Sequence, residues 1–349
     1  MYLRNSRVYI EDLRIAAKES VNIEKLYNSS VLITGATGTI GSFLVDMILQ
    51  KNLDDNANIV IYAAGRSQQR LEKRFGQDKT GFLHFVEYDI NLPIEFDFDV
   101  DYVIHAGGNA HPVAFNNDPV GTIIGNVNGT YNLLEYARSH GTKRLLYVSS
   151  GEVYGQGDVS LDSFEESYSG YVDPTSPRSC YPASKRATET LCASYTKQYG
   201  LETVIVRPCH TFGPVITEND SRANAQFIRN ALNGEDIVLK SPGTQMRSYC
   251  YVADCVSAII TVLLSGQAGK AYNSANSKAR ITIAGLATVI ASCVGRRVVY
   301  AAPETEEISN QTPIAKQVLS SAKIEALGWK GHFSVEEGIS HTIAIIKGE

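Results

Sequence analysis

The sequence lacks the features that mark several protein classes. Its 32 Lys and Arg residues are fewer than its 37 Asp and Glu residues, so it has no basic surplus of the kind that binds nucleic acid. No apolar run reaches the roughly 20 residues of a membrane span, and the best one, at 252–264, contains Asp254. The amino-terminal segment carries charges where a signal peptide has an apolar centre. We therefore expect a cytoplasmic protein, with neither nucleic acid nor a membrane as partner.

Cysteine is scarce and is not clustered. Six cysteines occur among 349 residues, with no Cys-x-x-Cys pair and no cluster of Cys and His ligands. This distribution is typical of reduced side chains that pack in the interior, rather than of disulfides or metal ligands. We therefore predict no metal site.

The chain has 349 residues, which is more than one hydrophobic core usually supports. The pattern of apolar residues also changes along the chain. Residues 1–29 form an extension with an expected helix at 10–17. Short apolar runs then alternate with helical patterns up to residue 206, which favours a parallel sheet covered on both faces. The expected strands are 31–34, 59–62, 83–87, 102–105, 145–149 and 203–206, and the expected helices are 40–51, 68–75, 121–138 and 184–199.

These patterns predict an α/β protein. A Rossmann doubly wound parallel sheet is expected in residues 30–206, with a later return near 247–275. Residues 207–349 are expected to form mainly a smaller C-terminal α/β substrate-binding lobe. Within that lobe, Ser334 and Glu337 have the spacing of a capping box and predict a last helix that ends near residue 346.

A glycine-rich turn stands where the first expected strand meets the first expected helix. In "GATGTIG", Gly35 suits a tight turn, Gly38 a close backbone approach to a pyrophosphate, and Gly41 close helix–strand packing. The positive end of the following helix would hold the pyrophosphate. The spacing is GxxGxxG rather than GxGxxG, and the alternative is a turn beside any helix. In this strand–turn–helix setting we predict a dinucleotide site.

The second expected strand bears on which dinucleotide is bound. After Gly65 no Asp or Glu is available for a ribose hydroxyl. Arg66 and Arg70 follow instead, and a guanidinium suits a 2′-phosphate. This favours NADP over NAD; the alternative is that Arg66 is solvated while NAD binds through the backbone. Asp89 and Ile90, at the end of the next strand, are placed to line an adenine pocket.

Two short motifs supply groups for proton transfer. "YPASK" places Tyr181 and Lys185 four residues apart, on one face of a helix. The ammonium and an oxidised nicotinamide are expected to lower the pKa of the phenol, ordinarily about 10. In "VSSGEVYG", Ser150 can hydrogen-bond the substrate oxygen on which Tyr181 acts, and Glu152 is the candidate acid or base at another carbon. The alternatives are a capping hydroxyl for Ser150 and a solvated turn carboxylate for Glu152.

The order of the motifs resembles a known family. "GATGTIG", "HAGGNAHP", "NVNGTYN", "SSGEVYG", "YPASK", "RPCHTFGP" and "QMRSYCYV" follow one another as in the extended short-chain dehydrogenase/reductase superfamily. The chain resembles its nucleotide-sugar epimerase/dehydratase branch over about residues 30–345. Two stretches, "GYVDPTSPRSCYPASKRATET" and "NDSRANAQFI", are similar to UDP-glucuronate decarboxylases.

The resemblance implies roles for particular residues. Tyr181, Lys185 and Ser150 would form a catalytic trio, and Asn126 would help order the helix that carries two of them. The further residues expected at the cofactor are Thr37, Thr39, Ile40, Ala106, Gly107 and Gly108. The residues expected at a nucleotide-diphosphate sugar are His111, Glu152, His210, Arg222, Gln226 and Arg247. We also expect a homodimer.

Three departures from the family pattern leave the reaction open. Gly151 stands where 4,6-dehydratases of the family carry Asp, so the proton donor for loss of water is missing. Val215 stands where decarboxylases usually have Arg. Residues 320–321 are serines near the position of an expected basic residue, and neither Lys316 nor Lys323 is clearly in register with it.

The family chemistry begins with transfer of hydride from C4 of the sugar to a nicotinamide, and the 4-keto group then permits several outcomes. We expect a 4-epimerase or a decarboxylase-like enzyme ahead of a 4,6-dehydratase, although His111 or His210 is an alternative source of the missing proton. The alternative of another class is a non-catalytic, dinucleotide-binding redox sensor.

Overall fold

A parallel sheet of seven strands forms the centre of the molecule. The computed structural model describes residues 3–76, 80–108, 110, 112–216, 220–302 and 314–349. The strand order is β10-β6-β5-β4-β1-β2-β3, and every neighbouring pair is parallel. These strands are β1 (Ser30–Thr34), β2 (Val60–Gly65), β3 (Leu83–Glu87), β4 (Tyr102–His105), β5 (Arg144–Val148), β6 (Thr203–Pro208) and β10 (Ala271–Ser274). The order reverses between β1 and β4, and doubly wound sheets bind ligands at the carboxyl ends of the strands beside such a reversal.

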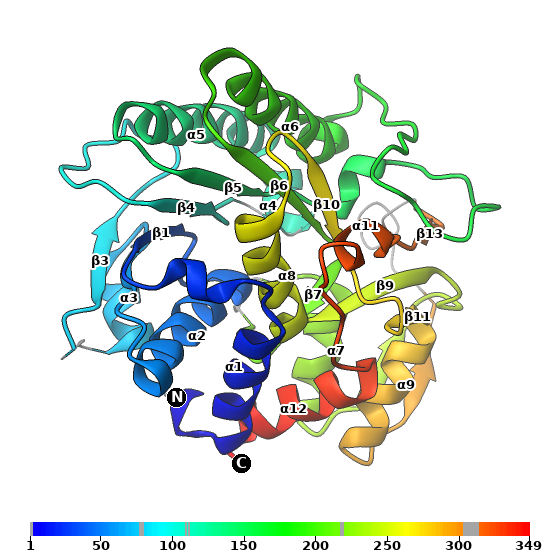
Figure 1. The fold of residues 1–349 in the computed structure, drawn as a ribbon. Coiled ribbons are helices and arrows are strands. Elements are labelled where there is room, and N and C mark those ends of the chain that lie inside the picture. Colours follow the sequence, from blue (N-terminus) through cyan, green and yellow to red (C-terminus); the bar gives the residue numbers. More distant parts are fainter. Residues whose placement is uncertain (1–2, 77–79, 109, 111, 217–219, 303–313) are drawn as a thin grey trace.

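Helices cover both faces of this sheet, as predicted (Figure 1). One face carries α5 (Pro119–Ser139) and α6 (Cys180–Tyr199), and the other carries α2 (Thr39–Asp55) and α8 (Val252–Ser265), with α3 (Gln68–Phe75) beside β2 and β3. Nearly every residue of α8 is buried, so the strongest apolar run of the sequence lies inside the protein. No helix among the described residues has the length and apolarity needed to cross a membrane.

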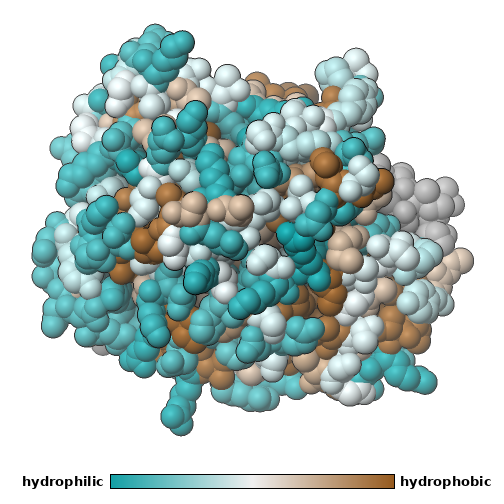
Figure 2. Space-filling view, turned by 45° about the vertical axis from the view of Figure 1, so that its right-hand side comes forward, coloured by the Kyte–Doolittle hydropathy of each residue, from teal (hydrophilic) through white to brown (hydrophobic). Residues whose placement is uncertain are grey.

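A second lobe packs against the carboxyl edge of the sheet. Its strand β9 (Met246–Tyr251) pairs with three others, β7 (His210–Phe212), β11 (Arg280–Thr282) and β13 (Lys316–Gln317). The remaining elements are β8 (Ile237–Leu239), β12 (Val298–Tyr300), α7 (Ala223–Leu232), α9 (Ile283–Cys293), α11 (Ala322–Glu325) and α12 (Val335–Lys347). The predicted capping box at Ser334 and Glu337 is present at the start of α12. On the face drawn in Figure 2, hydrophobic residues lie in small groups between hydrophilic ones.

The cysteines lie mostly in the interior. Five are buried, and Cys293 at the end of α9 is exposed, so the predicted packing role does not hold for that residue. In the part of the chain that the structure describes, no three His, Cys, Asp or Glu side chains are grouped to hold a metal ion.

The amino-terminal segment joins the two halves of the molecule. It consists of η1 (Leu3–Asn5), α1 (Arg7–Glu19) and η2 (Ile23–Leu26), and α1 lies against α2, α8 and α12 (Figure 1). The Tyr9 hydroxyl donates to Asp46 Oδ2 of α2 at 2.8 Å. The buried Asp12 accepts from the Tyr251 hydroxyl of β9 at 2.6 Å, and its other oxygen lies 2.8 Å from His341 Nδ1 of α12. The segment therefore connects α2, which covers the central sheet, with β9 and α12 of the second lobe.

His341 is expected to make the stability depend on pH. Its hydrogen bond with Asp12 raises the pKa of His341, against the lowering by partial burial. Because the folded pKa is raised, the stabilisation is fully present below the unfolded value of about 6.5 and is lost as the pH rises through the folded pKa. We expect His341→Gln to lower the urea midpoint more at about pH 6 than at about pH 9. A difference from wild type that is the same at both values would contradict this.

Candidate active site

A cavity of about 750 Å³ lies between the carboxyl edge of the sheet and the second lobe. The central sheet contributes residues 106–108 after β4, 149–152 after β5 and 208–209 at the end of β6, and residues 210–211 of β7 follow directly. The second lobe contributes side chains from α7, β8, β9 and β13. This size is in the range of small-molecule sites, and its place agrees with the switch point of the sheet.

The glycine turn is built for close packing of backbone. Gly35 has φ +67°, and a Cβ there would lie 2.6 Å from the carbonyl oxygen of Ala106. A Cβ at Gly41 would lie 2.3 Å from Gly35 O. Gly38 is the N-cap of α2 and supplies no capping side chain, so the first turn of this helix presents its backbone N–H groups. The turn therefore fits the pyrophosphate of a dinucleotide.

The other residues predicted around this turn lie in several settings. Ile40, Ala106, Gly107 and Gly108 line the cavity. Thr37 belongs to the glycine turn and is half-buried. The Thr39 hydroxyl donates to Val215 O at 2.8 Å, which ties the start of α2 to the chain after β7.

The residues predicted at the adenosine end do not line the cavity. Arg66 is exposed directly after β2, and Asp89 accepts hydrogen bonds from the backbone and side chain of Asn91. Ile90 packs closely on α5, where a Cβ at Gly129 would lie 1.9 Å from Ile90 Cγ1. Their contacts with a cofactor stay a prediction.

The four predicted catalytic side chains all line the cavity. Tyr181 and Lys185 lie on the first turns of α6, and Lys185 Nζ donates to Val148 O at 2.9 Å and lies 5.7 Å from the Tyr181 ring centroid. Ser150 caps η3 (Gly151–Tyr154), where its hydroxyl accepts from the backbone N–H of Glu152 at 3.1 Å. On α5, Asn126 Nδ2 donates at 2.9 Å to the hydroxyl of Ser184, which lies between Tyr181 and Lys185.

Burial has the largest effect on the pKa values of Tyr181 and Lys185. It raises the pKa of Tyr181 to about 12, aided by the charge of Glu152 and opposed by a hydrogen bond with Ser150 and by two arginines. Burial also lowers the pKa of Lys185 to about 8. Desolvation outweighs the nearby positive charges of the protein, so the lowering expected from these charges alone is wrong, whereas the lowering expected from an oxidised nicotinamide stays a prediction.

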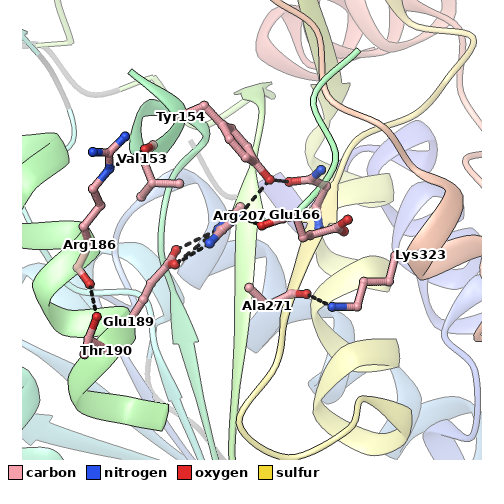
Figure 3. A network of polar contacts seen from close by, with 10 residues as sticks. Val153, Tyr154, Glu166, Arg186, Glu189, Thr190, Arg207, Ala271 and Lys323 are labelled. Atoms are coloured by element: carbon pink, nitrogen blue, oxygen red, sulfur yellow. Dashed lines mark hydrogen bonds and ion pairs between the residues drawn. The ribbon is translucent and has the colours of Figure 1, made fainter. Parts of the chain in front are cut away.

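A network behind the cavity fixes η3 relative to α6 (Figure 3). The Arg207 guanidinium of β6 donates to Glu189 of α6, at 2.6 Å in the shortest contact, and to the Tyr154 hydroxyl of η3 at 2.9 Å. Arg186 of α6 donates to the carbonyl oxygen of Val153 at 2.6 Å. The two elements that carry the catalytic candidates are thus held together by charge-assisted hydrogen bonds.

Two arginines predicted at the substrate line the cavity with different partners. Arg222 forms an ion pair with Asp220 at 2.6 Å. Arg247 is buried and donates to the carbonyl oxygens of Met246, Ile314 and Ala315, and no carboxylate among the described residues pairs with it. Burial accordingly lowers the pKa of Arg247. The third predicted residue, Gln226, is exposed on α7 and also lines the cavity.

The roles of the two proposed substitutes for a missing proton donor, His210 and His111, stay predictions. His210 lines the cavity, and burial, with the charges of Arg247 and Arg222, lowers the pKa of its imidazole to about 3, so the neutral form prevails near pH 7. His111 lies outside the described residues. A Cβ at Gly151 would lie 3.2 Å from Leu319 Cδ1 and 3.3 Å from Pro208 O, so a side chain there would fit tightly against these neighbours.

The basic residues near the end of the chain point away from the cavity. Lys316 Nζ donates to the carbonyl oxygen of Leu161, and Lys323 Nζ donates to that of Ala271 at 2.7 Å. Ser321 donates to Glu325 at 2.6 Å. The side chain of this segment that lines the cavity is the neutral Gln317.

Two residues beside the catalytic candidates, Arg178 and Phe115, were not predicted from the sequence. Arg178 Nη2 lies 3.1 Å from Glu152 Oε2, and Phe115 stacks on the Tyr181 ring with centroids 5.0 Å apart. A signal for Arg178 existed, because it lies three residues before Tyr181 in "SPRSCYPASK". Nothing in the sequence distinguished Phe115, which belongs to the short helix α4 (Pro112–Asn117).

Comparison with known proteins agrees with this architecture. Residues 31–275 match the NAD dependent epimerase/dehydratase family. UDP-glucuronic acid decarboxylase 6 of Arabidopsis thaliana is 34% identical over 315 residues, which cover 89% of this chain and 87% of that protein. The solved dTDP-glucose 4,6-dehydratase of Streptomyces venezuelae with NAD bound has a TM-score of 0.75 and 26% identity, covering 91% of this chain and 97% of that one. UDP-glucose 4-epimerase of Thermotoga maritima, at TM-score 0.76 and 22% identity over 91% of this chain and 98% of that one, has the same fold. The chain therefore belongs to the NAD-dependent epimerase/dehydratase family.

Proposed function

We propose that this enzyme transiently oxidises C4 of a nucleotide-diphosphate sugar and alters the sugar before C4 is reduced again. The main support is that Tyr181, Ser150 and Glu152 share one cavity with Arg222 and Arg247. Guanidinium groups suit a diphosphate, and the other three suit proton transfer at a sugar. A bound nicotinamide would accept hydride from C4 and return it. The glycine turn and residues 106–108 would hold this cofactor.

Tyr181 is the proposed acid–base at the C4 hydroxyl. Ser150 is hydrogen-bonded to the phenol, which supports the proposal that it contacts the same sugar oxygen. With a pKa of about 8, Lys185 is mostly charged near pH 7, and its ammonium favours the phenolate form of Tyr181. Because the pKa of Tyr181 is about 12, phenolate is rare until further positive charge enters the site.

For the second step we propose loss of a C6 carboxylate from a UDP-linked hexuronate. The C5–C6 bond would break, its electron pair would pass to the C4 ketone to form an enol, CO₂ would leave, and C5 would take up a proton. Glu152 is the group proposed to handle the proton at C5. The support is the 34% identity to a UDP-glucuronic acid decarboxylase over most of both chains. Loss of water is disfavoured because Gly151 has no side chain to donate a proton.

A 4-epimerase is the second candidate, and Gln317 favours it. A C6 carboxylate requires positive charge, yet this wall of the cavity carries a neutral amide, while Lys316 bonds to a carbonyl of another loop. Epimerisation at C4 needs only that the ketone turn over before hydride returns, with no added cation or acid.

The deciding experiment is mass spectrometry of the purified protein incubated with UDP-glucuronate, UDP-glucose and matched dTDP-, CDP- and GDP-sugars. We expect CO₂ and a UDP-pentose from UDP-glucuronate. An epimer of the same mass, resolved by chromatography, would instead support the second candidate. Tight dinucleotide binding without conversion of any sugar would contradict an enzymatic role and favour a redox sensor.

Arg247→Ala is expected to weaken binding of UDP far more than binding of the dinucleotide. Loss of a charge-assisted contact usually costs about 1.5–3 kcal/mol, and Arg247 belongs to β9 of the second lobe, whereas the glycine turn follows β1 of the central sheet. Calorimetry with both ligands measures this, and Arg297→Ala is the control because that guanidinium is exposed and pairs only with Asp236 among the described residues. Equal losses for both ligands would remove Arg247 from the substrate site.

We further propose a preference for NADP within this NAD-dependent family. Its support is the exposed Arg66 directly after β2, with no carboxylate at that strand end. Identification of the nucleotide that copurifies, and titration of both cofactors against Arg66→Ala, test this. Tighter NAD binding that the substitution leaves unchanged would contradict it.

A homodimer through α5 is also proposed, in a cytoplasmic enzyme. Four apolar residues of α5 are exposed at helical spacing, namely Val120, Ile123, Ile124 and Tyr131. Such a stripe is typical of a helix that packs against a partner. Sedimentation at several concentrations should give a dimer that Ile124→Glu converts to monomer; a wild-type monomer would contradict the proposal.

A further inference from the structure

Arg178 touches the carboxylate that the mechanism places at the second step. It lies in η4 (Pro177–Ser179), directly before α6. Its Nη2 is 3.1 Å from Glu152 Oε2 and 3.3 Å from Oε1, so one nitrogen is shared by both oxygens. Among the described residues, no other cation forms an ion pair with Glu152. Arg178 itself does not line the cavity, whereas Glu152 does.

The same guanidinium also belongs to a stack that ends at Tyr181. Its carbon lies 4.5 Å from the Phe115 ring centroid, and Phe115 stacks on the Tyr181 ring at 5.0 Å with an interplanar angle of 16°. Phe115 is buried, and Cys180 Sγ donates to its carbonyl oxygen at 3.5 Å. The guanidinium is therefore fixed by an aromatic face as well as by a charge, which restricts its freedom more than a solvated ion pair does.

This arrangement has a consequence for Glu152. A glutamate has three rotatable side-chain bonds, and a proton-transfer group must be held close to its productive position. The Ser150 hydroxyl bonds to the backbone N–H of Glu152 and does not orient its side chain. The carboxylate is oriented by Arg178. The ion pair also offsets the charge that an anionic sugar substituent would meet on approaching a bare carboxylate.

We propose that Arg178 is the positioning residue for Glu152 in the step after C4 oxidation, and that it permits sugars with an anionic C6 group. This inference rests on the proposed function. Arg178 acts mainly through Glu152. Its charge also lowers the pKa of Tyr181, but less than the Ser150 hydrogen bond and Arg222 do, so the removal of hydride and of the C4 hydroxyl proton should change little. Its loss should therefore separate the two halves of the reaction.

The test compares Arg178→Gln and Arg178→Lys with wild type and with Arg280→Gln. Arg280 is the matched control because it also forms one ion pair, with Asp162, and its side chain is 29% exposed, like that of Arg178. Rapid mixing with UDP-glucuronate measures the appearance of reduced nicotinamide, and mass spectrometry measures the 4-keto sugar and the final product. Thermal melting and UDP affinity are measured for each variant.

For Arg178→Gln we expect the first step to stay within about threefold of wild type and the second to fall about 10- to 100-fold. The 4-keto sugar and reduced nicotinamide should then accumulate, while UDP affinity is unchanged. Arg178→Lys should restore part of the second step, and Arg280→Gln should match wild type. Equal slowing of both steps, or no slowing of either, would overturn the role of Arg178 alone. A wild-type enzyme that never oxidises a nucleotide sugar would overturn the proposed function as well.

Discussion

Tyr181→Phe is expected to abolish turnover while the dinucleotide still binds. The substitution removes only the hydroxyl, which is the proposed proton acceptor for the C4 hydroxyl, and it keeps the ring that stacks on Phe115. Loss of a positioned acid–base group typically costs about 10²–10⁴-fold in rate. Steady-state turnover of the sugar found in the assay measures the loss, and calorimetry measures dinucleotide affinity.

Tyr249→Phe supplies the control for this prediction. Tyr249 lines the same cavity and is also buried, and burial raises its pKa to about 12 as it does for Tyr181. The two substitutions therefore remove similar hydroxyls, but only one has Ser150 as a partner. Near-normal turnover of Tyr181→Phe, or an equal loss in both variants, would remove Tyr181 from its proposed role.

Gly35→Ala is expected to eliminate dinucleotide binding and to lower the melting temperature. Alanine at φ +67° costs about 1–2 kcal/mol by itself. The added Cβ would also meet Ala106 O at 2.6 Å and Gly107 Cα at 2.9 Å, which are backbone atoms that cannot rotate aside. The turn would have to separate from residues 106–108, which line the cavity. We expect an affinity loss of about 100-fold or more, equivalent to about 3 kcal/mol.

Gly141→Ala separates the two causes. Gly141 has φ +65°, close to the value for Gly35, but a Cβ there meets no atom within 4 Å. The control therefore carries the backbone strain without the clash, and it should lower stability without affecting the cofactor. Comparable loss of dinucleotide binding in both variants would mean that strain, rather than close packing of the turn, explains the effect.

The elements of the central sheet could be predicted because their signals are local. Apolar runs such as 83–87 and 102–105 coincide with β3 and β4, and the expected helix 68–75 coincides with α3. The turn at Gly35 was predictable for the same reason, since strand, glycines and helix are contiguous in the chain. Tyr181 and Lys185 also meet through one helix, with no need of distant contacts.

The environment of the catalytic side chains was decided only by the tertiary structure. Positive charge was expected to lower the pKa of Tyr181, but burial by segments far away in the sequence raises it. A pKa depends on how many atoms displace water from the group, and sequence spacing does not give that number.

The sequence likewise did not predict which of two neighbouring side chains faces the cavity. By itself the sequence determined six of the seven strands of the central sheet, the glycine turn and the Tyr181–Lys185 pair. The sequence did not determine whether Lys316 or Gln317 faces the cavity. It also did not determine that Arg178 of η4 pairs with Glu152 of η3. Successive side chains of a strand point to opposite sides, so the pairing of β13 with β9 selects one of two neighbours. That pairing joins residues about 70 positions apart, and such non-local contacts form only when the whole chain has packed.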